Sequence, residues 1–359
     1  MRILQVITSM HIGGAEKLIT EIAPLLQAKG HQVEVLLFDG TNTSFKKELK
    51  KADIRILEFS YGGPVYNPLY IFRLIPLLRK YDIIHTHNTA PQLFSALAGA
   101  LCSAVLVTTE HNTSNRRREW KWYRLIDRWM YNRYRSVICI SDAAEVNLKK
   151  YLGCFHTHIV TIYNGINIHR FMEALPDEKL MCQKADRKVM VMVAGFRYQK
   201  DQDTLIRAMK YLPKEKYEIW LVGDGERRTF LEQLCRDEQI ENQVRFLGIR
   251  NNIPEILKVA DFVVMSSHFE GLSLSSIEGM AVGKPFIASD VDGLREITCG
   301  AGILFPHGDA QQLAREIEHL AENRNYYNQV AKRCLERAEE YDIYKMVDGY
   351  ERIYKKLFK

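Results

Sequence analysis

The sequence predicts an α/β protein with two doubly wound domains, each built around a parallel sheet. Short runs that are apolar at nearly every position alternate with stretches of helical pattern, and strands buried on both faces are typical of parallel sheets. The alternation begins at residue 2 and starts again at residue 188. A chain of 359 residues is long enough for two such domains, each with its own core.

The expected elements follow this alternation along the chain. Strands are expected at 2–9, 31–38, 82–87, 104–111 and 135–141, and in the second half at 188–196, 218–225, 243–248, 261–267 and 284–290. Asn164-Gly165 predicts a turn between the two halves, and the polar stretch 173–187 is expected to be a linker. Residues 324–359 are expected to be helical, with a break near 340–342. In open α/β sheets ligands bind beyond the carboxyl ends of the strands, so we expect the chemistry in the following loops, at a cleft between the domains.

Composition excludes several classes of protein. The formal net charge of +6 is modest, and the seven cysteines include no CxxC pair, which argues against a disulfide framework and favours a reducing cytoplasm. The apolar N-terminus reads as a strand rather than a signal peptide. The uncharged run 89–109 is long enough to cross a bilayer, but Pro91 and Gln92 favour a buried helix followed by a buried strand.

Two glutamates flank a run of small residues after the expected strand 261–267, in the stretch "HFEGLSLSSIEG". Free amide groups and the helix dipole make the start of a helix a site for an anion such as a diphosphate. Glu270 precedes the expected helix and Glu278 lies within it, so Glu278 is placed to accept hydrogen bonds from a ribose diol. The alternative for Glu278 is a capping box with Ser275.

Three other strand ends carry candidate residues. Gly13 and Gly14 allow close backbone approach to a substrate, or simply form a tight turn. Arg197 and Lys200 would hold phosphate charge on a leaving group, or are solvated surface charges. His111 can hydrogen-bond a sugar or polarise a reacting hydroxyl, or is a packed or capping histidine.

Metal binding is not expected. His85 and His87 resemble metal ligands, but no third ligand is evident from the sequence. Two Asp-x-Asp motifs occur, at 201–203 and 290–292. Asp203 is more simply a helix cap and 290–292 a turn.

A basic aromatic segment spans 114–135, with eight Lys/Arg against two acids. Trp122, Leu125, Ile126 and Trp129 share one face at helical spacing, which is the profile of an interfacial helix attracted to anionic lipid. The alternative is a helix packed on its own domain with a solvated basic face. Nucleic acid is not expected, because no reader motif accompanies the charge. The candidate contacts to a membrane or acceptor are Arg116, Arg117, Arg118, Trp122 and Trp129.

Taken together, these motifs resemble glycosyltransferase family four, the retaining GT-B glycosyltransferases with an E-x7-E signature. The matching stretches run in family order over nearly the whole chain. They are "GGAEK", "TEHN", "YNGI", "KDQDTLI", "LVGDGE", "FLG", "FEGLSLSSIEGMAVGKP" and "SDVDGLREI".

The resemblance implies two Rossmann-like domains facing a cleft: residues 1–168 on the acceptor side, with the C-terminal helix 343–359 packed back on them, and residues 169–342 binding the nucleotide sugar. It implies donor contacts from Gly13, Gly14, Gly223, Gly271, Leu272, Ser273 and Glu278. It implies catalytic roles for His111, Glu270, Lys200 and Arg197. Many members have arginine where this chain has Gly195, so we expect Arg197 to reach the same phosphate from a shifted position.

The expected activity is transfer of a sugar from a nucleotide sugar, a UDP-sugar, with retention of configuration and without a metal or other cofactor. The expected acceptor is a polyprenyl-diphosphate-linked or other glycan used in cell-surface polysaccharide synthesis. The basic aromatic segment predicts a cytoplasmic protein held on the anionic inner face of the membrane. The alternatives are a nucleotide-sugar epimerase of the same fold and a non-catalytic nucleotide-binding protein at the membrane.

Overall fold

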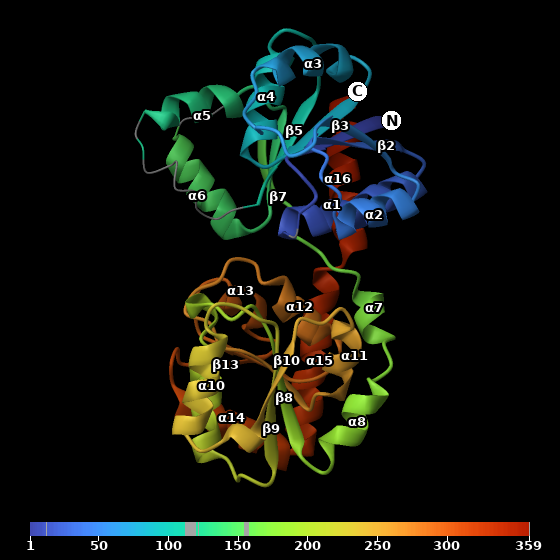
Figure 1. The fold of residues 1–359 in the computed structure, drawn as a ribbon. Helices are drawn as coiled ribbons and strands as arrows, with labels where there is room; N and C mark the ends of the chain where they lie inside the picture. The colour runs from blue at the N-terminus through green and yellow to red at the C-terminus, as the bar shows by residue number, and fades with distance from the viewer. Residues whose placement is uncertain (12, 112–119, 121, 154–157, 359) are drawn as a thin grey trace. The chain divides into compact units, whose positions relative to one another are not determined.

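The computed structural model describes residues 1–11, 13–111, 120, 122–153 and 158–358. The chain divides into two compact units, shown in Figure 1. Unit 1 comprises Met1–Asn164 and Ile343–Lys359, and unit 2 comprises Gly165–Asp342. The division falls within the Asn164-Gly165 dipeptide, a few residues before the expected boundary.

Unit 1 is built on a seven-stranded parallel sheet of order β3-β2-β1-β4-β5-β6-β7. The strands are β1 (Arg2–Ile7), β2 (Gln32–Asp39), β3 (Arg55–Ser60), β4 (Ile83–His87), β5 (Leu106–Glu110), β6 (Ser136–Cys139) and β7 (His158–Thr161). The helices are α1 (Gly14–Ala28), α2 (Ser44–Lys51), α3 (Leu69–Leu78), α4 (Thr89–Gly99), α5 (Tyr123–Tyr131), α6 (Asp142–Leu152) and α16 (Ile343–Phe358).

The two faces of this sheet are covered by different helices (Figure 1). Successive strand residues point to opposite faces, so Ile3 packs in one core and Leu4 in the other. The first core contains the apolar residues of α1 and α16, and the second contains those of α3, α4, α5 and α6. The C-terminal helix therefore belongs to the core of unit 1, with Tyr350 and Tyr354 completely buried.

Unit 2 is built on a six-stranded parallel sheet of order β10-β9-β8-β11-β12-β13. Its strands are β8 (Lys188–Val193), β9 (Tyr217–Val222), β10 (Val244–Gly248), β11 (Phe262–Met265), β12 (Phe286–Ser289) and β13 (Ile303–Phe305). Its α-helices are α7 (Ile168–Met172), α8 (Glu178–Lys184), α9 (Gln202–Ala208), α10 (Arg228–Asp237), α11 (Ile253–Val259), α12 (Leu274–Ala281), α13 (Leu294–Thr298), α14 (Ala310–Glu322) and α15 (Arg324–Glu340).

The predicted fold class is confirmed, and three strands were missed. The missed strands β3, β7 and β13 all lie at an edge of their sheet. Edge strands lack a neighbour on one side, and β3 and β7 have few fully buried residues, so they carry no continuous apolar run. Run 89–109 forms α4 and β5 as predicted. No helix in the described part of the chain has the length and hydropathy to cross a bilayer.

The predicted linker 173–187 is wrong. Its middle forms α8, whose first turn is capped by the Asp177 side chain through the Leu180 amide. The helix is fixed to unit 2 because Lys184 forms an ion pair with Asp261 at 2.6 Å and also donates to the Val259 carbonyl. The polar composition of this stretch reflects one exposed helix rather than a flexible connection.

Candidate active site

The loop between β11 and α12 holds Glu270 in a defined position. Its carboxylate pairs with the Lys200 ammonium and accepts a hydrogen bond from the Ser267 hydroxyl at 2.9 Å. The Glu270 side chain is 6% exposed and that of Lys200 is 20% exposed. Gln199 fixes the same loop through its side-chain amide, which donates to the Phe269 carbonyl at 3.1 Å. The structure thus brings together two residues that lie 70 positions apart in the sequence.

Gly293 supports this loop from the next strand end, after β12. Its φ is +82°, a region that residues with a side chain rarely occupy. A Cβ at this position would also lie only 2.6 Å from the Glu270 carbonyl oxygen and would overlap the Gly271 carbonyl oxygen. The loop therefore needs glycine at position 293 in order to keep its backbone where it is.

Helix α12 begins at Leu274 with Ser273 as its N-cap, and the Ser273 side chain makes no capping bond. The first amide groups of a helix have no partner within the helix, so this end presents N–H donors after Gly271 and Leu272. Glu278 lies five residues after the N-cap and is buried. The capping-box alternative is wrong, because Ser275 is already inside the helix.

The ends of β8 and β9 lie next to each other in the sheet. Gly223 has a φ of +139°, and a Cβ there would overlap the Ala194 carbonyl oxygen, so glycine is required by the backbone itself. Arg197 is exposed, and its side chain approaches Gly195, since the Arg197 Nε lies 4.0 Å from where a Gly195 Cβ would stand. The expectation that Arg197 takes the place of an arginine at position 195 stays a prediction.

The carboxylates of both Asp-x-Asp motifs have protein partners. Asp203 is not the N-cap of α9; it forms a bidentate pair with Arg227 at 2.8 and 2.9 Å. Asp290 and Asp292 both pair with Arg295 in the turn before α13. These contacts give each motif a structural role.

One trio in the described residues has ligand atoms within 4.8 Å of one another: Asp201, His268 and His307. His268 directs Nδ1 to His307 Nε2 at 2.7 Å and Nε2 toward Asp201 at 3.8 Å. Only the contact between the two histidines is a hydrogen bond, because 3.8 Å between His268 Nε2 and the Asp201 carboxylate is too long for one. The ligand atoms of the trio are close enough to share one ion, so the expectation that no metal binds stays a prediction.

In unit 1, Gly13 and Gly14 lie at the junction of β1 and α1, as predicted. Gly13 is the N-cap of α1, and a side chain there would collide with the carboxylate of Glu16, which reaches back over the helix start. Asn88, after β4, donates to the same carboxylate at 3.2 Å. Around Gly14, by contrast, a Cβ would meet nothing within 4 Å. The contact at position 13 is with the end of a flexible side chain, whereas position 14 has open space.

The buried His85 and His87 and the partly exposed His111 form a chain of side chains at the ends of β4 and β5, which we call the histidine network. His87 Nδ1 lies 2.9 Å from His111 Nε2, and His87 Nε2 lies 2.8 Å from Gln5 Oε1. His85 bonds Tyr354 of α16 through Nδ1 and the Thr109 hydroxyl through Nε2, the latter at 2.7 Å. With their ring nitrogens occupied by protein partners, His85 and His87 are not metal ligands.

Burial lowers the pKa of each histidine in this network. Desolvation lowers the pKa of His85 to about 3 and that of His111 to about 4, and it also lowers the pKa of His87. Positive charge on one ring would disfavour charge on the next, which adds to the effect for His85 and His87. All three rings are therefore neutral near pH 7.

The sequence reading missed Gln5 and Tyr354. Gln5 pairs with His85 in the strand register, so these side chains share the face that α16 covers. Strand alternation alone indicates that residues 83, 85 and 87 share one face. The contact with Tyr354 spans 269 positions, and no local signal predicts it.

The basic aromatic segment is described only in part. Arg116, Arg117 and Arg118 lie outside the described residues. Trp122 is the N-cap of α5 and is 57% exposed, and Trp129 on α5 is 38% exposed. Trp129, Leu125 and Ile126 form one wall of an open apolar groove whose other wall is Leu93 and Leu97 of α4. The predicted apolar face is therefore exposed on the surface of unit 1.

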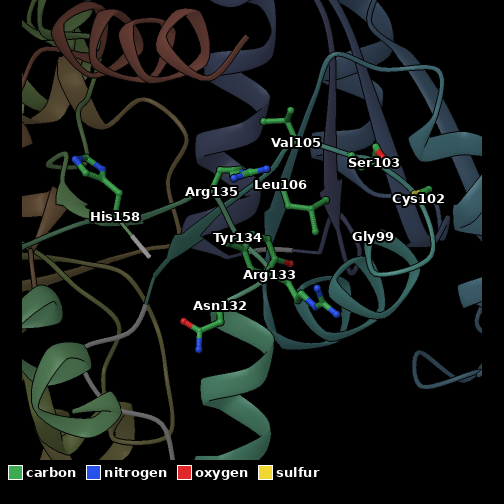
Figure 2. A pocket seen from close by; sticks show the side chains of 11 residues that line it. Gly99, Cys102, Ser103, Val105, Leu106, Asn132, Arg133, Tyr134, Arg135 and His158 are labelled. Atoms are coloured by element: carbon green, nitrogen blue, oxygen red, sulfur yellow. The ribbon is translucent and has the colours of Figure 1, made fainter. Parts of the chain in front are cut away.

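A polar cavity that the sequence did not predict lies at the amino-terminal ends of β5, β6 and β7 (Figure 2). Its lining includes Cys102, Arg133, Arg135 and His158. Figure 2 shows Arg133, Arg135 and His158 well separated rather than gathered at one point. Since ligands of open α/β sheets bind at the carboxyl ends of the strands, we do not assign the donor to this cavity.

Comparison with known proteins identifies the fold and family. The Glycosyltransferase Family 4 model matches residues 12–170, and the model for Glycosyl transferases group 1 matches residues 182–338. The structure of Anabaena Alr3699/HepE in complex with UDP superimposes with a TM-score of 0.85 at 24% identity, covering 99% of this chain and 100% of that chain. The chain belongs to the GT-B-fold glycosyltransferases.

The similarity to curated glycosyltransferases extends over different fractions of this chain. An uncharacterized glycosyltransferase of Methanocaldococcus jannaschii is 31% identical over 61% of this chain, which spans 60% of that protein. The UDP-Gal:alpha-D-GlcNAc-diphosphoundecaprenol alpha-1,3-galactosyltransferase of Escherichia coli is 26% identical over 79% of this chain and 78% of that protein. The glycosyltransferase from Rickettsia africae superimposes with a TM-score of 0.83 at 21% identity, covering 100% of this chain and 98% of that chain.

Proposed function

We propose that the chain transfers a sugar from a UDP-sugar to a lipid-linked saccharide, with retention of anomeric configuration. The observation that carries the proposal is the arrangement after β11. A lysine–glutamate pair, a glycine-supported loop and an open helix start lie together at the carboxyl end of one parallel sheet. The UDP complexes of Anabaena Alr3699/HepE, a protein of the same fold, support UDP as the nucleotide.

In this proposal each part of the site binds a different part of the donor. The amides of Gly271, Leu272 and Ser273 bind the diphosphate, and Glu278 accepts hydrogen bonds from the ribose diol. Glu270 faces the transferred sugar. Lys200 and Arg197 balance the charge that develops on the leaving phosphate, while Gly13, Gly14 and His111 line the reaction centre. Gly223 shapes the donor site through its backbone.

Retention is proposed without a covalent intermediate. Glu270 is engaged by the Lys200 ammonium and the Ser267 hydroxyl, which lowers its suitability as a nucleophile. A front-face displacement, in which the leaving diphosphate helps to deprotonate the acceptor, requires only positioning and charge stabilisation from the protein. No metal is part of this mechanism, because lysine, arginine and helix amides supply the positive charge.

The acceptor side is proposed to face an anionic membrane. The α4–α5 groove and Trp122 expose apolar surface within a strongly basic segment, a combination that favours binding to anionic lipid. The Escherichia coli relative is named for a diphosphoundecaprenol acceptor, which supports a lipid-linked saccharide here too. We propose that the protein acts in polysaccharide synthesis, bound peripherally to the cytoplasmic face of the membrane.

Donor binding is tested by titrating UDP, GDP and ADP calorimetrically against the parent and Glu278→Gln. Removing the charged acceptor is expected to weaken UDP binding by about 1.5–3 kcal/mol, and the matched control is Glu316→Gln, a part-buried glutamate of α14 that accepts from Gln312. Unchanged UDP affinity in Glu278→Gln would contradict the ribose role. Transfer that survives EDTA is expected, and complete inhibition by EDTA would contradict the metal-free mechanism.

Incubation with UDP-sugars separates the proposed activity from its alternatives. Sugar transfer to an added lipid-linked saccharide supports the proposal. Epimerised UDP-sugar without any acceptor would identify an epimerase. Binding without transfer, hydrolysis or epimerisation would identify a non-catalytic nucleotide-binding protein.

A further inference from the structure

The His87 ring lies between the side chains of Gln5 and His111, and these contacts determine which of its two nitrogens is protonated. Its Nε2 lies 2.8 Å from Gln5 Oε1, a carboxamide oxygen that can only accept a hydrogen bond. Gln5 and His87 are both fully buried. His87 Nε2 therefore carries the proton that makes this bond.

The proton on His87 determines the proton on His111. A neutral imidazole has one N–H, so His87 Nδ1 is unprotonated and accepts a hydrogen bond. His111 Nε2 is 2.9 Å away and must be the donor. Because His111 is also neutral near pH 7, its remaining nitrogen, Nδ1, carries a lone pair.

We propose that Gln5 and His87 are positioning residues that hold His111 in its Nε2-protonated form, so that His111 Nδ1 accepts a hydrogen bond from a hydroxyl of the transferred sugar. His111 is partly exposed at the end of β5, and no residue in the described part of the chain bonds its Nδ1. The proposal rests on the proposed function for the identity of the ligand. The tautomer itself follows from unit 1 alone.

The same arrangement limits what His111 can do. A lone pair on Nδ1 attracts an O–H group and disfavours contact with another acceptor, such as a phosphate oxygen or a fluorine atom. His111 is therefore expected to discriminate between a sugar hydroxyl and a group of the same size that cannot donate. It does not serve as the acid that protonates the leaving group.

The C-terminal helix α16 orients Gln5, the first residue in this series of hydrogen bonds. Tyr354 of α16 lies between His85 Nδ1, which it bonds, and Gln5 Nε2 at 3.5 Å. His85 Nε2 bonds the Thr109 hydroxyl, so a donor and an acceptor are matched at every step. Helix α16 thereby orients the Gln5 amide with its oxygen toward His87.

The first test is the tautomer itself, read from the ¹⁵N shifts of the His111 ring in the metal-free, ligand-free protein near pH 7. The signals are assigned by their loss in His111→Gln. We expect Nε2 to be protonated and Nδ1 to be unprotonated, two states with well-separated nitrogen shifts. A protonated Nδ1 in the parent protein would overturn the proposal, whatever the protein binds.

The second test removes the hydrogen bond between His87 and His111. His87→Leu is expected to let His111 populate both tautomers, which moves its Nδ1 shift toward the protonated value. His87→Asn offers a carboxamide oxygen near the position of Nδ1 and is expected to restore the parental signal. Thr86→Val is the matched control, since Thr86 is a buried residue of the same strand whose hydroxyl bonds Tyr134 instead. Parental His111 shifts in His87→Leu would overturn the positioning role.

The third test connects the tautomer to the sugar. Donors in which one sugar hydroxyl at a time is replaced by fluorine are compared in the parent and His111→Ala. One analogue is expected to lose about twofold to tenfold in kcat/KM with the parent and nothing further with His111→Ala, the range of a neutral hydrogen bond. UDP affinity, which involves no sugar, is expected to be the same in both. If every fluorinated donor loses as much with His111→Ala as with the parent, the hydroxyl contact is wrong even though transfer itself stands.

Discussion

Replacing Gly293 by alanine tests whether the Glu270 loop is held by the turn before α13. The residue has a φ of +82° and a ψ of −46°, and strain of this kind costs about 1–3 kcal/mol for a residue with a side chain. The new Cβ would also lie 2.6 Å from the Glu270 carbonyl oxygen, well inside van der Waals contact. The backbone of Glu270 and Gly271 must therefore move to accommodate it.

Gly283→Ala is the control that introduces backbone strain at a positive φ without a steric collision. Gly283 follows α12 and has a φ of +70°, but a Cβ there would meet nothing within 4 Å. We expect Gly283→Ala to cost about 1–2 kcal/mol of stability from the left-handed conformation alone. Gly293→Ala should cost more than this by about 1–3 kcal/mol, the usual range for overpacking.

The assay is urea unfolding followed by fluorescence, together with UDP titration and transfer kinetics. Trp220 is fully buried in β9 and reports on unit 2, whereas the other three tryptophans lie in the exposed part of unit 1. A displacement of about 1 Å at a positioning loop can cost about 100-fold in rate, so kcat/KM should fall far more in Gly293→Ala than in Gly283→Ala. Equal stability losses and parental UDP binding in the two variants would refute the role of Gly293.

Three further outcomes are expected. Gly14→Ala should unfold like the parent, because a Cβ there has open space, yet transfer should fall if a substrate approaches this backbone; parental activity would show that none does. Replacing Trp122 and Trp129 by serine should weaken binding to anionic vesicles in a sedimentation assay, whereas Tyr211→Ser, an exposed aromatic of unit 2, should not. The histidine network has depressed pKa values when folded, so below about pH 6.5 the unfolded chain takes up protons that the folded chain does not. Stability should therefore fall between about pH 6.5 and 4, by up to about 1.4 kcal/mol per pH unit for each histidine, with hydrogen exchange accelerating first in unit 1; a flat profile there would contradict neutral buried rings.

The sequence predicted those parts of the fold that follow from burial on both faces of a sheet. Central strand β11 is a continuous apolar run, and central strand β4 is buried along its whole length, as expected for strands of a parallel sheet. The break between α15 and α16 was predicted as well. Edge strand β3 and helix α8 were not, because a partly exposed element does not differ in composition from a loop.

The candidate site was predictable as a set of positions but not as a set of contacts. The carboxyl ends of parallel strands meet at one edge, so Lys200 after β8 and Glu270 after β11 were each placed at that edge, and β8 and β11 are neighbours in the sheet. Their ion pair is a side-chain arrangement that spacing does not specify. The role of Gly293 also escaped prediction, since it depends on the backbone of a loop that is distant in the sequence.

The two glutamates differ in what binding a donor requires of them. Glu278 lies in the interior of α12, where the helix fixes its backbone, so in its proposed role it would meet a ribose diol from a position that the helix sets. Glu270 is paired with Lys200, and Lys200 is the cation proposed to bind phosphate. Donor binding would therefore exchange or share a partner of Lys200 rather than fill a vacant site, and the carboxylate released from the ammonium would become available to the sugar. In that view the ion pair links arrival of the diphosphate to presentation of Glu270.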